Sequence, residues 1–302
     1  MAGQGAPSIH EKAHAKINLY LHVTGRRDDG YHELETLFAF SNFGDRLTLA
    51  PSKALELRST GSQGDELPDP EQNLVWQATQ LLAKHIGQIP TGLITLEKNL
   101  PVAAGLGGGS ADAAAVLRGL LRLWEVSLPE ADLHQLALSL GADVPVCMKS
   151  ESALAVGIGD QLAPVILPKC GVVLVNPLVG LETRDVFAAW RDSGGVFTTQ
   201  QQPVNSLGSF PALLEVLHAR SNDLEAPART LLPAIDDVLM ALQGLANCAL
   251  ARMSGSGASC FGLFETLGEA EAASVAIKAA HPEWWVQSSS LKDGVNASMG
   301  AT

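Results

Sequence analysis

The sequence predicts an α+β fold, in which strands and helices are mixed along the chain. Residues 16–23 alternate apolar and polar side chains, which is the period of a strand with one buried face. The segment that follows Asn73 instead repeats its apolar residues with the 3.6-residue period of a helix. The two kinds of segment follow one another without a steady strand–helix alternation, which disfavours a doubly wound parallel sheet.

The amino-acid composition is that of an acidic globular protein. The 302 residues include 20 Lys and Arg against 32 Asp and Glu, a net charge of −12, and 46% of them are hydrophobic. This length corresponds to about two domains, and we predict the boundary near residue 165, with domains at 1–165 and 166–302. The acidic balance disfavours a nucleic-acid polymer as partner, because such polymers are bound by an excess of Lys and Arg. A small phosphorylated ligand remains compatible with it.

The chain shows no signal for export or membrane insertion. The first 15 residues lack the apolar core of a secretory signal, and no window approaches the roughly 18 apolar residues of a membrane span. The four cysteines have no C-x-x-C spacing and are too few for a disulfide scaffold. We therefore expect a cytoplasmic protein with reduced thiols and no membrane partner, either a monomer or a weak homodimer.

Apolar patterns and turn residues define the other predicted elements. Asn73 is a typical helix cap, and Gly141 a typical helix end. The first half is predicted to hold strands at 34–40 and 45–50, a helix from residue 73, a strand at 93–96, helices at 110–124 and 129–141, and a strand at 153–157. The second half is predicted to hold a strand at 172–175, a helix, a polar stretch at 192–209, two long helices, strands at 249–253 and 259–264, a helix at 269–280 and a strand at 284–287.

A glycine-rich loop before the helix at 110–124 is the most unusual segment. Four of the six residues from Gly105 to Ser110 are glycine. Glycine allows positive φ angles and close approach of a ligand to the main chain, and free N–H groups at a helix N-terminus attract anions. The segment is therefore either a cradle for a phosphate chain or a flexible strand-to-helix turn. Its length, the preceding Pro101 and the immediate Ala-rich helix favour phosphate binding.

The loop matches none of three common nucleotide motifs. The P-loop pattern fails because no lysine follows the glycines. The pattern G-x-G-x-x-G fails because Ser110 stands at its third glycine. The H-R-D signature of protein kinases is also missing.

Two segments carry residues with both a functional and a plain interpretation. Lys16 and Asn18 share the polar face of the first strand, about 6–7 Å apart by strand rise. Lys16 is either a cation that lines a cleft or a surface lysine, and the pattern by itself favours the surface. Asp143 is either a functional carboxylate or an Asx turn or helix cap. The eight histidines show no ligand spacing, so we expect no zinc site.

Four motifs resemble those of the GHMP kinases (galactokinase, homoserine kinase, mevalonate kinase and phosphomevalonate kinase). They are A-K-I-N-L-x-L, P-V-A-A-G-L-G-G-G-S-A-D, L-G-A-D-V-P and M-S-G-S-G-A-S-C, and they extend from about Lys16 to Phe264. More narrowly, G-R-R-D-D-G-Y-H between the first two strands resembles the family of 4-diphosphocytidyl-2-C-methyl-D-erythritol kinases of the non-mevalonate isoprenoid pathway. Several motifs in the family's order are more specific than any one of them.

The resemblance implies a two-domain kinase that uses ATP and Mg²⁺. The amino-terminal domain is expected to resemble ribosomal protein S5 domain 2, and the carboxy-terminal domain a ferredoxin-like sandwich. The implied reaction transfers the γ-phosphoryl group of ATP to the 2-hydroxyl of 4-(cytidine 5′-diphospho)-2-C-methyl-D-erythritol, giving the 2-phosphate and ADP. Mg²⁺ is expected as the counter-ion of ATP, and Ser110 is its candidate protein ligand by analogy.

The resemblance also implies roles for individual residues. Asp143 is implied as the base, with Lys16 as its charged partner. A neighbouring ammonium lowers the proton affinity of a carboxylate, so Asp143 either removes the proton or mainly orients the hydroxyl. Tyr31 and His32 are implied to hold the cytosine. The residues implied to line the substrate side are Asn18, Lys98, Thr183 and Phe187, and those implied to wrap the ATP phosphates are Pro101, Val102, Ala103, Ala104, Gly105, Leu106, Gly107, Gly108, Gly109, Ser110 and Ala111.

Some residues in these motifs depart from the family pattern or have an open role. Ala103 and Ala104 stand where relatives often carry glycine, which makes the front of the loop stiffer. Asp112 places a carboxylate in the first turn of the helix, where it either caps the helix or touches Mg²⁺. The loop at 254–258 is expected to shape the wall of the cleft rather than to take part in the chemistry.

Three other functions compete with this one. Another GHMP kinase, acting on homoserine or mevalonate, would have no base for Tyr31 and His32 to hold. A non-catalytic nucleotide-binding relative is disfavoured because Lys16, Asp143 and the loop glycines are all present. A dinucleotide oxidoreductase is disfavoured because its fingerprint is missing.

Overall fold

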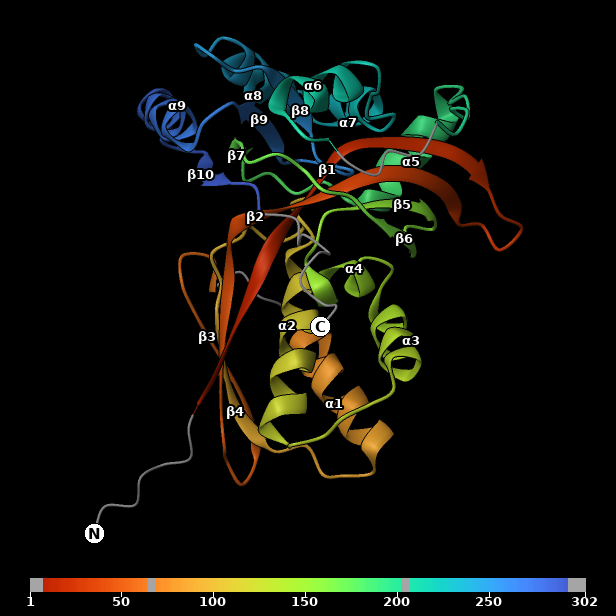
Figure 1. The fold of residues 1–302 in the computed structure, drawn as a ribbon, viewed down its shortest axis with the longest axis vertical. Helices are drawn as coiled ribbons and strands as arrows, with labels where there is room; N and C mark the ends of the chain where they lie inside the picture. The colour runs from red at the N-terminus through yellow and green to blue at the C-terminus, as the bar shows by residue number, and fades with distance from the viewer. Residues whose placement is uncertain (1–7, 65–68, 202–206, 293–302) are drawn as a thin grey trace. The chain divides into compact units, whose positions relative to one another are not determined.

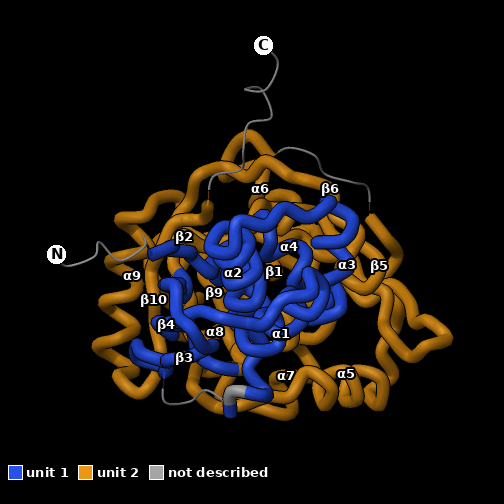
Figure 2. The backbone as a smooth tube through the Cα atoms, turned by 90° about the horizontal axis from the view of Figure 1, so that it is seen from below, with its two compact units in different colours: residues 1–15, 44–102, 107–149 blue, residues 16–43, 103–106, 150–302 orange. Residues whose placement is uncertain are grey.

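The computed structural model describes residues 8–64, 69–201 and 207–292. The chain divides into two compact units (Figure 2), of which unit 1 comprises residues 1–15, 44–102 and 107–149 and unit 2 comprises residues 16–43, 103–106 and 150–302. Strands β1 (Ile9–Arg26) and β2 (His32–Ala50) each contribute residues to both units. This division follows packing rather than family domains, so the boundary near residue 165 stays a prediction. Within the described ranges, no helix has both the length and the apolar character needed to cross a membrane.

In its described residues, unit 1 contains part of a mixed sheet and the helices α1 to α4 (Figure 1). The last five residues of β2 pair antiparallel with β4, and β4 pairs parallel with β3. Helices α1 and α2 pack side by side, and the N-terminus of α1 is capped by Asn73, whose side chain accepts a hydrogen bond from the N–H of Val75 as the sequence predicts. The elements are β3 (Leu55–Thr60), a 3₁₀ turn (Pro70–Gln72), α1 (Leu74–Ile86), β4 (Gly92–Glu97), α2 (Gly108–Leu123), α3 (Glu130–Leu140) and α4 (Val144–Lys149).

Two glycines allow close packing in unit 1. A Cβ atom at Gly119 of α2 would lie 2.6 Å from Cδ1 of Leu49, so the helix approaches β2 only because it carries no side chain there. A Cβ atom at Gly44 would overlap the carbonyl oxygen of Ala13 in β1. The strand pairing therefore continues through Gly44, and the two strands predicted at 34–40 and 45–50 form the single strand β2.

Unit 2 contains a four-stranded antiparallel sheet with the strand order β10-β7-β9-β8. Along the chain, helices α5 to α8 connect the first two strands of this sheet and α9 connects the last two, and the strand order is 4-1-3-2, which confirms the ferredoxin-like expectation. Strand β5 pairs with the first part of β2 and with β6. The elements are β5 (Ala153–Gly157), β6 (Gln161–Pro164), β7 (Gly171–Asn176), α5 (Thr183–Asp192), α6 (Phe210–His218), α7 (Glu225–Leu231), α8 (Ala234–Gln243), β8 (Leu250–Met253), β9 (Cys260–Phe264), α9 (Leu267–Ala280) and β10 (Trp285–Ser290).

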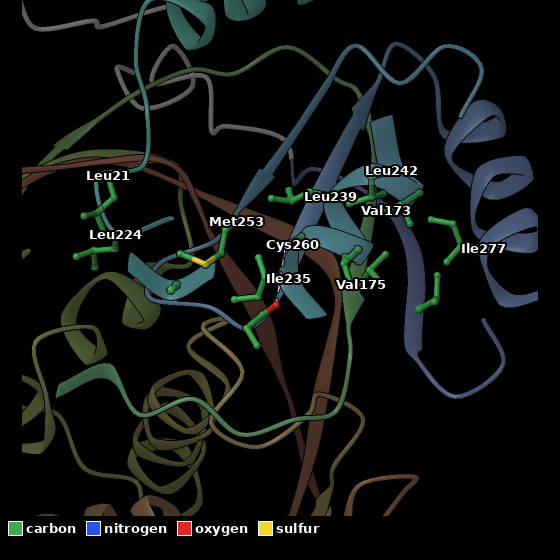
Figure 3. Packing of buried hydrophobic residues seen from close by; sticks show 14 of the residues in the cluster. Leu21, Val173, Val175, Leu224, Ile235, Leu239, Leu242, Met253, Cys260 and Ile277 are labelled. Carbon is green, nitrogen blue, oxygen red and sulfur yellow. Dashed lines mark hydrogen bonds between the residues drawn. The ribbon is translucent and has the colours of Figure 1, made fainter. Parts of the chain in front are cut away.

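The core of unit 2 is continuous across the helices and this sheet (Figure 3). Val173 and Val175 of β7 lie among Ile235 and Leu242 of α8, and Ile277 comes from α9. The two valines, Ile235 and Leu242 are fully buried. Burial of each such side chain stabilises the fold by roughly 1.5–3 kcal/mol. The core therefore fixes the sheet and the helices of unit 2.

Several predicted boundaries were wrong. The two long helices predicted after the polar stretch are three shorter ones, α6, α7 and α8. Pro233 separates α7 from α8, because the residue before a proline is pushed to extended backbone and Leu232 has φ −135° and ψ 89°. Strand β6 and helix α4 were not predicted. In the polar stretch, α5 ends at Asp192, the chain is irregular over 195–201, and residues 202–206 lie outside the described part.

Candidate nucleotide and substrate site

The glycine-rich loop Pro101–Ala111 turns into α2 through three residues with left-handed backbone. Ala103, Gly105 and Gly107 have φ angles of 51°, 72° and 62°, and Gly107 is the N-cap of the helix. The helix therefore begins at Gly108, two residues before the predicted start. The first N–H groups of any helix have no acceptor within it and carry the positive end of its dipole. The end of the loop at Gly107 and Gly108 therefore offers backbone N–H groups that suit an anion.

The front of the loop, residues 103–106, belongs to unit 2 and is held by neutral hydrogen bonds. The carbonyl oxygen of Leu106 accepts from the N–H of Lys16 at 2.9 Å. The carbonyl oxygen of Gly105 accepts from the Ser254 hydroxyl at 3.1 Å. A Cβ atom at Gly105 would lie 2.6 Å from the carbonyl oxygens of both Ser254 and Gly257. Gly105 is thus required for packing of the loop on the segment 254–257, whatever the ligand.

The back of the loop, residues 107–111, belongs to unit 1 and adjoins a buried ion cluster. The ammonium of Lys98 lies 2.6 Å from a carboxylate oxygen of Asp45 and 2.6 Å from one of Asp112. The other oxygen of Asp45 accepts from the N–H groups of Asn99 and Leu100. A Cβ atom at Gly108 would lie 3.0 Å from Nζ of Lys98. The cluster therefore connects the chain entering the loop to the first turns of α2.

The charges in this cluster shift the pKa values of Lys98 and Asp112. Burial raises the pKa of Asp112 to about 8, with the charge of Asp45 adding to the rise and that of Lys98 opposing it. Burial by itself would lower the pKa of Lys98, but the two carboxylates outweigh it and raise that pKa. Lys98 is thus a buried cation at neutral pH. Its carboxylate partners use two of its three N–H donors, and in the described part of the chain no further acceptor meets the third.

Of the two roles that the sequence left open for Asp112, the structure excludes the helix cap, and the contact with Mg²⁺ stays a prediction. Its one bonded oxygen pairs with Lys98, and its other oxygen, Oδ1, is buried and meets no donor among the described residues. The N-cap of α2 is Gly107, which has no side chain to offer. Asp112 is therefore part of the support for Lys98.

The polar face of β1 is buried in unit 2. Lys16 is 5% exposed and its Nζ lies 4.6 Å from the centre of the Phe38 ring, so the surface interpretation favoured by its pattern was wrong. The backbone N–H of Asn18 donates to the Ser254 hydroxyl at 3.1 Å and its side-chain amide donates to Thr36 at 2.9 Å. The amide oxygen of Asn18 is buried and meets no donor among the described residues. Such an orphaned acceptor fits a hydroxyl or N–H of a ligand.

The segment 254–257, which packs on the front of the glycine-rich loop, also contacts the first turn of α5. The hydroxyl groups of Thr183, in the first turn of α5, and Ser256 are 2.8 Å apart. Asn18 contacts Ser254, two residues earlier. Asn18, Thr183 and the front of the glycine-rich loop therefore converge on one buried segment. The sequence singled out this segment by its glycines but not as the element that joins the others.

Aromatic rings form another part of the unit 2 site. The ring of His32 stacks on Phe187 at 4.6 Å with an angle of 15° between the planes. Tyr31, its neighbour, is 61% exposed. Burial lowers the pKa of His32, and the charges of Arg26 and Arg191 lower it further. A neutral imidazole has one donor and one acceptor nitrogen, which is what reading the edge of a base requires.

The two predicted catalytic residues lie in different units. Asp143 of unit 1 is half-buried in the turn between α3 and α4, where its carbonyl oxygen accepts from the N–H of Cys147 at 3.3 Å. Lys16 belongs to unit 2. Sequence reasoning missed Asp45, since nothing in its local pattern shows that it faces Lys98.

Comparison with known proteins identifies the class of enzyme to which this chain belongs. The model of the GHMP kinase N-terminal domain matches residues 73–151, and that of the GHMP kinase C-terminal domain matches residues 201–283. The fold is shared with homoserine kinase from Cytophaga hutchinsonii (TM-score 0.68, 21% identity, 97% of this chain and 98% of the other). The fold is also shared with L. major mevalonate kinase (TM-score 0.68, 14% identity, 96% of this chain and 97% of the other). The fold and the two matched models define a GHMP kinase.

Closer relatives narrow the class. A 4-diphosphocytidyl-2-C-methyl-D-erythritol kinase of Rhodopseudomonas palustris (strain BisB18) is 46% identical over 94% of this chain and 95% of its own length. The 4-diphosphocytidyl-2-C-methyl-D-erythritol kinase of Paramagnetospirillum magneticum is 47% identical over 94% of this chain and 99% of its own length. A crystal structure of a 4-(cytidine 5′-diphospho)-2C-methyl-D-erythritol kinase has a TM-score of 0.75, 35% identity and coverage of 95% and 100%. The chain belongs to the family of 4-diphosphocytidyl-2-C-methyl-D-erythritol kinases.

Proposed function

We propose that this chain phosphorylates the 2-hydroxyl of 4-(cytidine 5′-diphospho)-2-C-methyl-D-erythritol with ATP, a step of the non-mevalonate route to isopentenyl diphosphate. Family membership supports the substrate. The observation in the molecule itself that carries the proposal is the stacked pair of His32 and Phe187 beside the exposed ring of Tyr31. Aromatic rings of this kind bind a nucleobase by stacking, and homoserine and mevalonate have no base to stack.

In this proposal the glycine-rich loop binds the ATP phosphates. Phosphoryl transfer depends on positioning and charge neutralisation far more than on covalent help from the protein. The N-terminal turn of α2 supplies N–H donors, and the ammonium of Lys98, whose charge is balanced by its two acidic partners, adds a further N–H close to Gly108. Its remaining N–H suits a phosphate oxygen or a polar group of the substrate. Lys98, which its acidic partners hold, is proposed to line the substrate side.

Mg²⁺ fits the residues present. Among the described residues no group of three or more His, Cys, Asp or Glu side chains is placed to hold a metal ion. A magnesium ion bound mainly by phosphate oxygens and water needs no such group, and Ser110 offers one hydroxyl in the first turn of α2. When bound, the ion would neutralise charge on the phosphates.

The acceptor hydroxyl requires a proton acceptor and orienting groups. Asp143 is proposed to accept or orient that proton, with Lys16 as its charged partner. The orphaned amide oxygen of Asn18 and the Thr183 hydroxyl are proposed to bind the methylerythritol part. A cytoplasmic location and a monomer or weak homodimer stay predictions.

The test is release of ADP by the purified protein with the cytidyl substrate, homoserine or mevalonate. We expect turnover with the cytidyl substrate alone. Turnover with homoserine or mevalonate would assign the chain to another GHMP activity, and binding of ATP without turnover of any acceptor would favour a nucleotide-binding relative.

Two substitutions test the proposed catalytic pair. Asp143→Asn should leave ATP binding intact and lower kcat by about 10²–10⁴-fold. Lys16→Ala should give a comparable loss, which Lys16→Arg restores only in part because a planar guanidinium differs from a compact ammonium. If the kcat of Asp143→Asn or of Lys16→Ala stays within threefold of the wild-type value, the substituted residue has no part in the mechanism.

A further inference from the structure

Helix α5 extends the aromatic site beyond the residues that the family pattern supplies. Thr183, Phe187 and Trp190 follow one another at spacings of four and three residues, so they lie on one face of α5. The ring of Trp190 meets the ring of His32 edge-on, with centroids 5.8 Å apart and an angle of 88°. His32 thus contacts two rings of the same helix, one with its face and one at a right angle.

These two contacts together fix the plane of the His32 ring. Rotation of the imidazole about its Cβ–Cγ bond would break the stack on Phe187 and the edge contact with Trp190 at once. Burial and the charges of Arg26 and Arg191 keep the ring neutral. A fixed neutral ring presents its donor and its acceptor nitrogen in set directions, which a freely turning ring does not.

Trp190 is itself held rigidly. It is 6% exposed and packs in the core of unit 2 with Val186 and Ala228. A Cβ atom at Gly195 would overlap the indole ring, and the ring of Phe197 lies 5.6 Å away. The indole is therefore enclosed by the core and by the chain that follows α5, and it has little freedom to follow His32 if that ring turns.

We propose that Trp190 is a positioning residue that makes the site selective for cytosine over uracil by holding the ring of His32. The inference rests on the proposed function, because it assumes that His32 faces the base. The two bases stack equally well, so stacking does not separate them. They differ in the donor and acceptor pattern at their edge, and a hydrogen-bonding group of fixed direction rejects the mismatched pattern because polar groups would be buried unpaired.

The experiment compares Trp190→Leu and Trp190→Phe with Phe264→Leu in the full-length protein. Phe264 is a fully buried aromatic residue of the same core, in β9, so its replacement matches the loss of packing. The measured quantities are the Kd values for cytidine 5′-diphosphate and uridine 5′-diphosphate and the KM for ATP. The NMR titration of the His32 ring, assigned from His32→Gln, reports on the ring directly.

We expect Trp190→Leu to reduce the preference for the cytidine diphosphate about tenfold, with KM for ATP unchanged. The His32 pKa should rise toward its ordinary value as the ring becomes freer. Trp190→Phe should recover part of the preference for cytidine 5′-diphosphate. Phe264→Leu should lower the melting temperature and leave that preference unchanged.

An unchanged preference in Trp190→Leu overturns the proposal. A changed preference with an unchanged His32 titration also overturns it, because Trp190 would then act on the base directly. Absence of kinase activity in the wild type would contradict the proposed function instead, since the two Kd values are measured without turnover.

Discussion

The two halves of the glycine-rich loop are fixed by opposite kinds of interaction. In unit 2 the front half is held by neutral hydrogen bonds from backbone N–H groups and the Ser254 hydroxyl, and by close contact of Gly105 with Gly257. In unit 1 the back half adjoins three buried ionisable side chains, those of Lys98, Asp45 and Asp112. The first half is constrained by shape and the second by electrostatics.

This difference predicts how each half responds to change. A single neutral hydrogen bond contributes about 1 kcal/mol net, and its loss is felt locally. Buried charges depend on one another, so removal of one leaves the others unpaired at a much larger cost. The charged half therefore needs all of its members, whereas the neutral half needs mainly the space left by its glycines.

The largest effect is expected from Lys98→Met, which leaves two acidic side chains in the buried cluster without their cation. The free energy of unfolding, measured in urea at neutral pH, should fall by about 3–5 kcal/mol. The double variant Lys98→Met/Asp112→Leu should recover at least half of the loss, because one buried acidic side chain without a partner is gone and Asp45 keeps its two backbone N–H donors. A single variant within 1 kcal/mol of wild type would show that the cluster is not a coupled unit.

Gly105→Ala tests the front half against a matched glycine. Gly105 and Gly87 have φ angles of 72° and 71°, but only Gly105 has atoms in the way of a Cβ. Gly87→Ala should cost about 1 kcal/mol for the left-handed backbone. Gly105→Ala should cost about 3 kcal/mol, because the overlap with two carbonyl oxygens adds to it. Equal losses in thermal melts of the two variants would contradict the close-approach argument.

Unit 2 should also be sensitive to acid, through His22. Its Nε2 accepts from the N–H of Ser221 at 3.3 Å, and burial lowers its pKa. A histidine whose pKa is lowered in the folded state contributes stability that is present above about pH 6.5 and is lost as the pH falls toward the folded value. The unfolding free energy of His22→Gln should therefore fall less between pH 7 and pH 5, by about 1 kcal/mol. The exposed His85→Gln is the control, and equal pH dependence of the two variants would exclude His22 as a cause.

The smallest expected effect concerns the stiff front of the loop. Ala103 has a φ of 51°, which an alanine adopts at a cost and a glycine does not. Ala103→Gly should raise the unfolding free energy by about 0.5 kcal/mol, the relief of strain being partly offset by the greater freedom of unfolded glycine. Ala104→Gly should instead lower it, because Ala104 is buried and is not among the described residues with positive φ. Two variants that change stability equally would remove the strain argument.

Much of the fold was readable from local pattern. The strand at 153–157, the helix cap at Asn73 and the α+β class follow from side-chain period and capping chemistry, which act over a few residues. The family motifs gave the class of enzyme because their order along the chain is itself specific. The prediction failed where a boundary depended on packing, as in β2, which continues only because Gly44 lies against Ala13.

The sequence by itself determined which residues are polar, where the loop lies and which strand carries Lys16 and Asn18. Only the tertiary structure decided what those residues meet. Period two places Lys16 on one face of β1, but burial of that face depends on segments far along the chain, such as Ser254, which is 236 residues from Asn18. Asp45 and Lys98 are 53 residues apart and become partners only when β2 and β4 pair. Electrostatic and steric support of a site is a property of contacts between distant segments, and no local pattern encodes it.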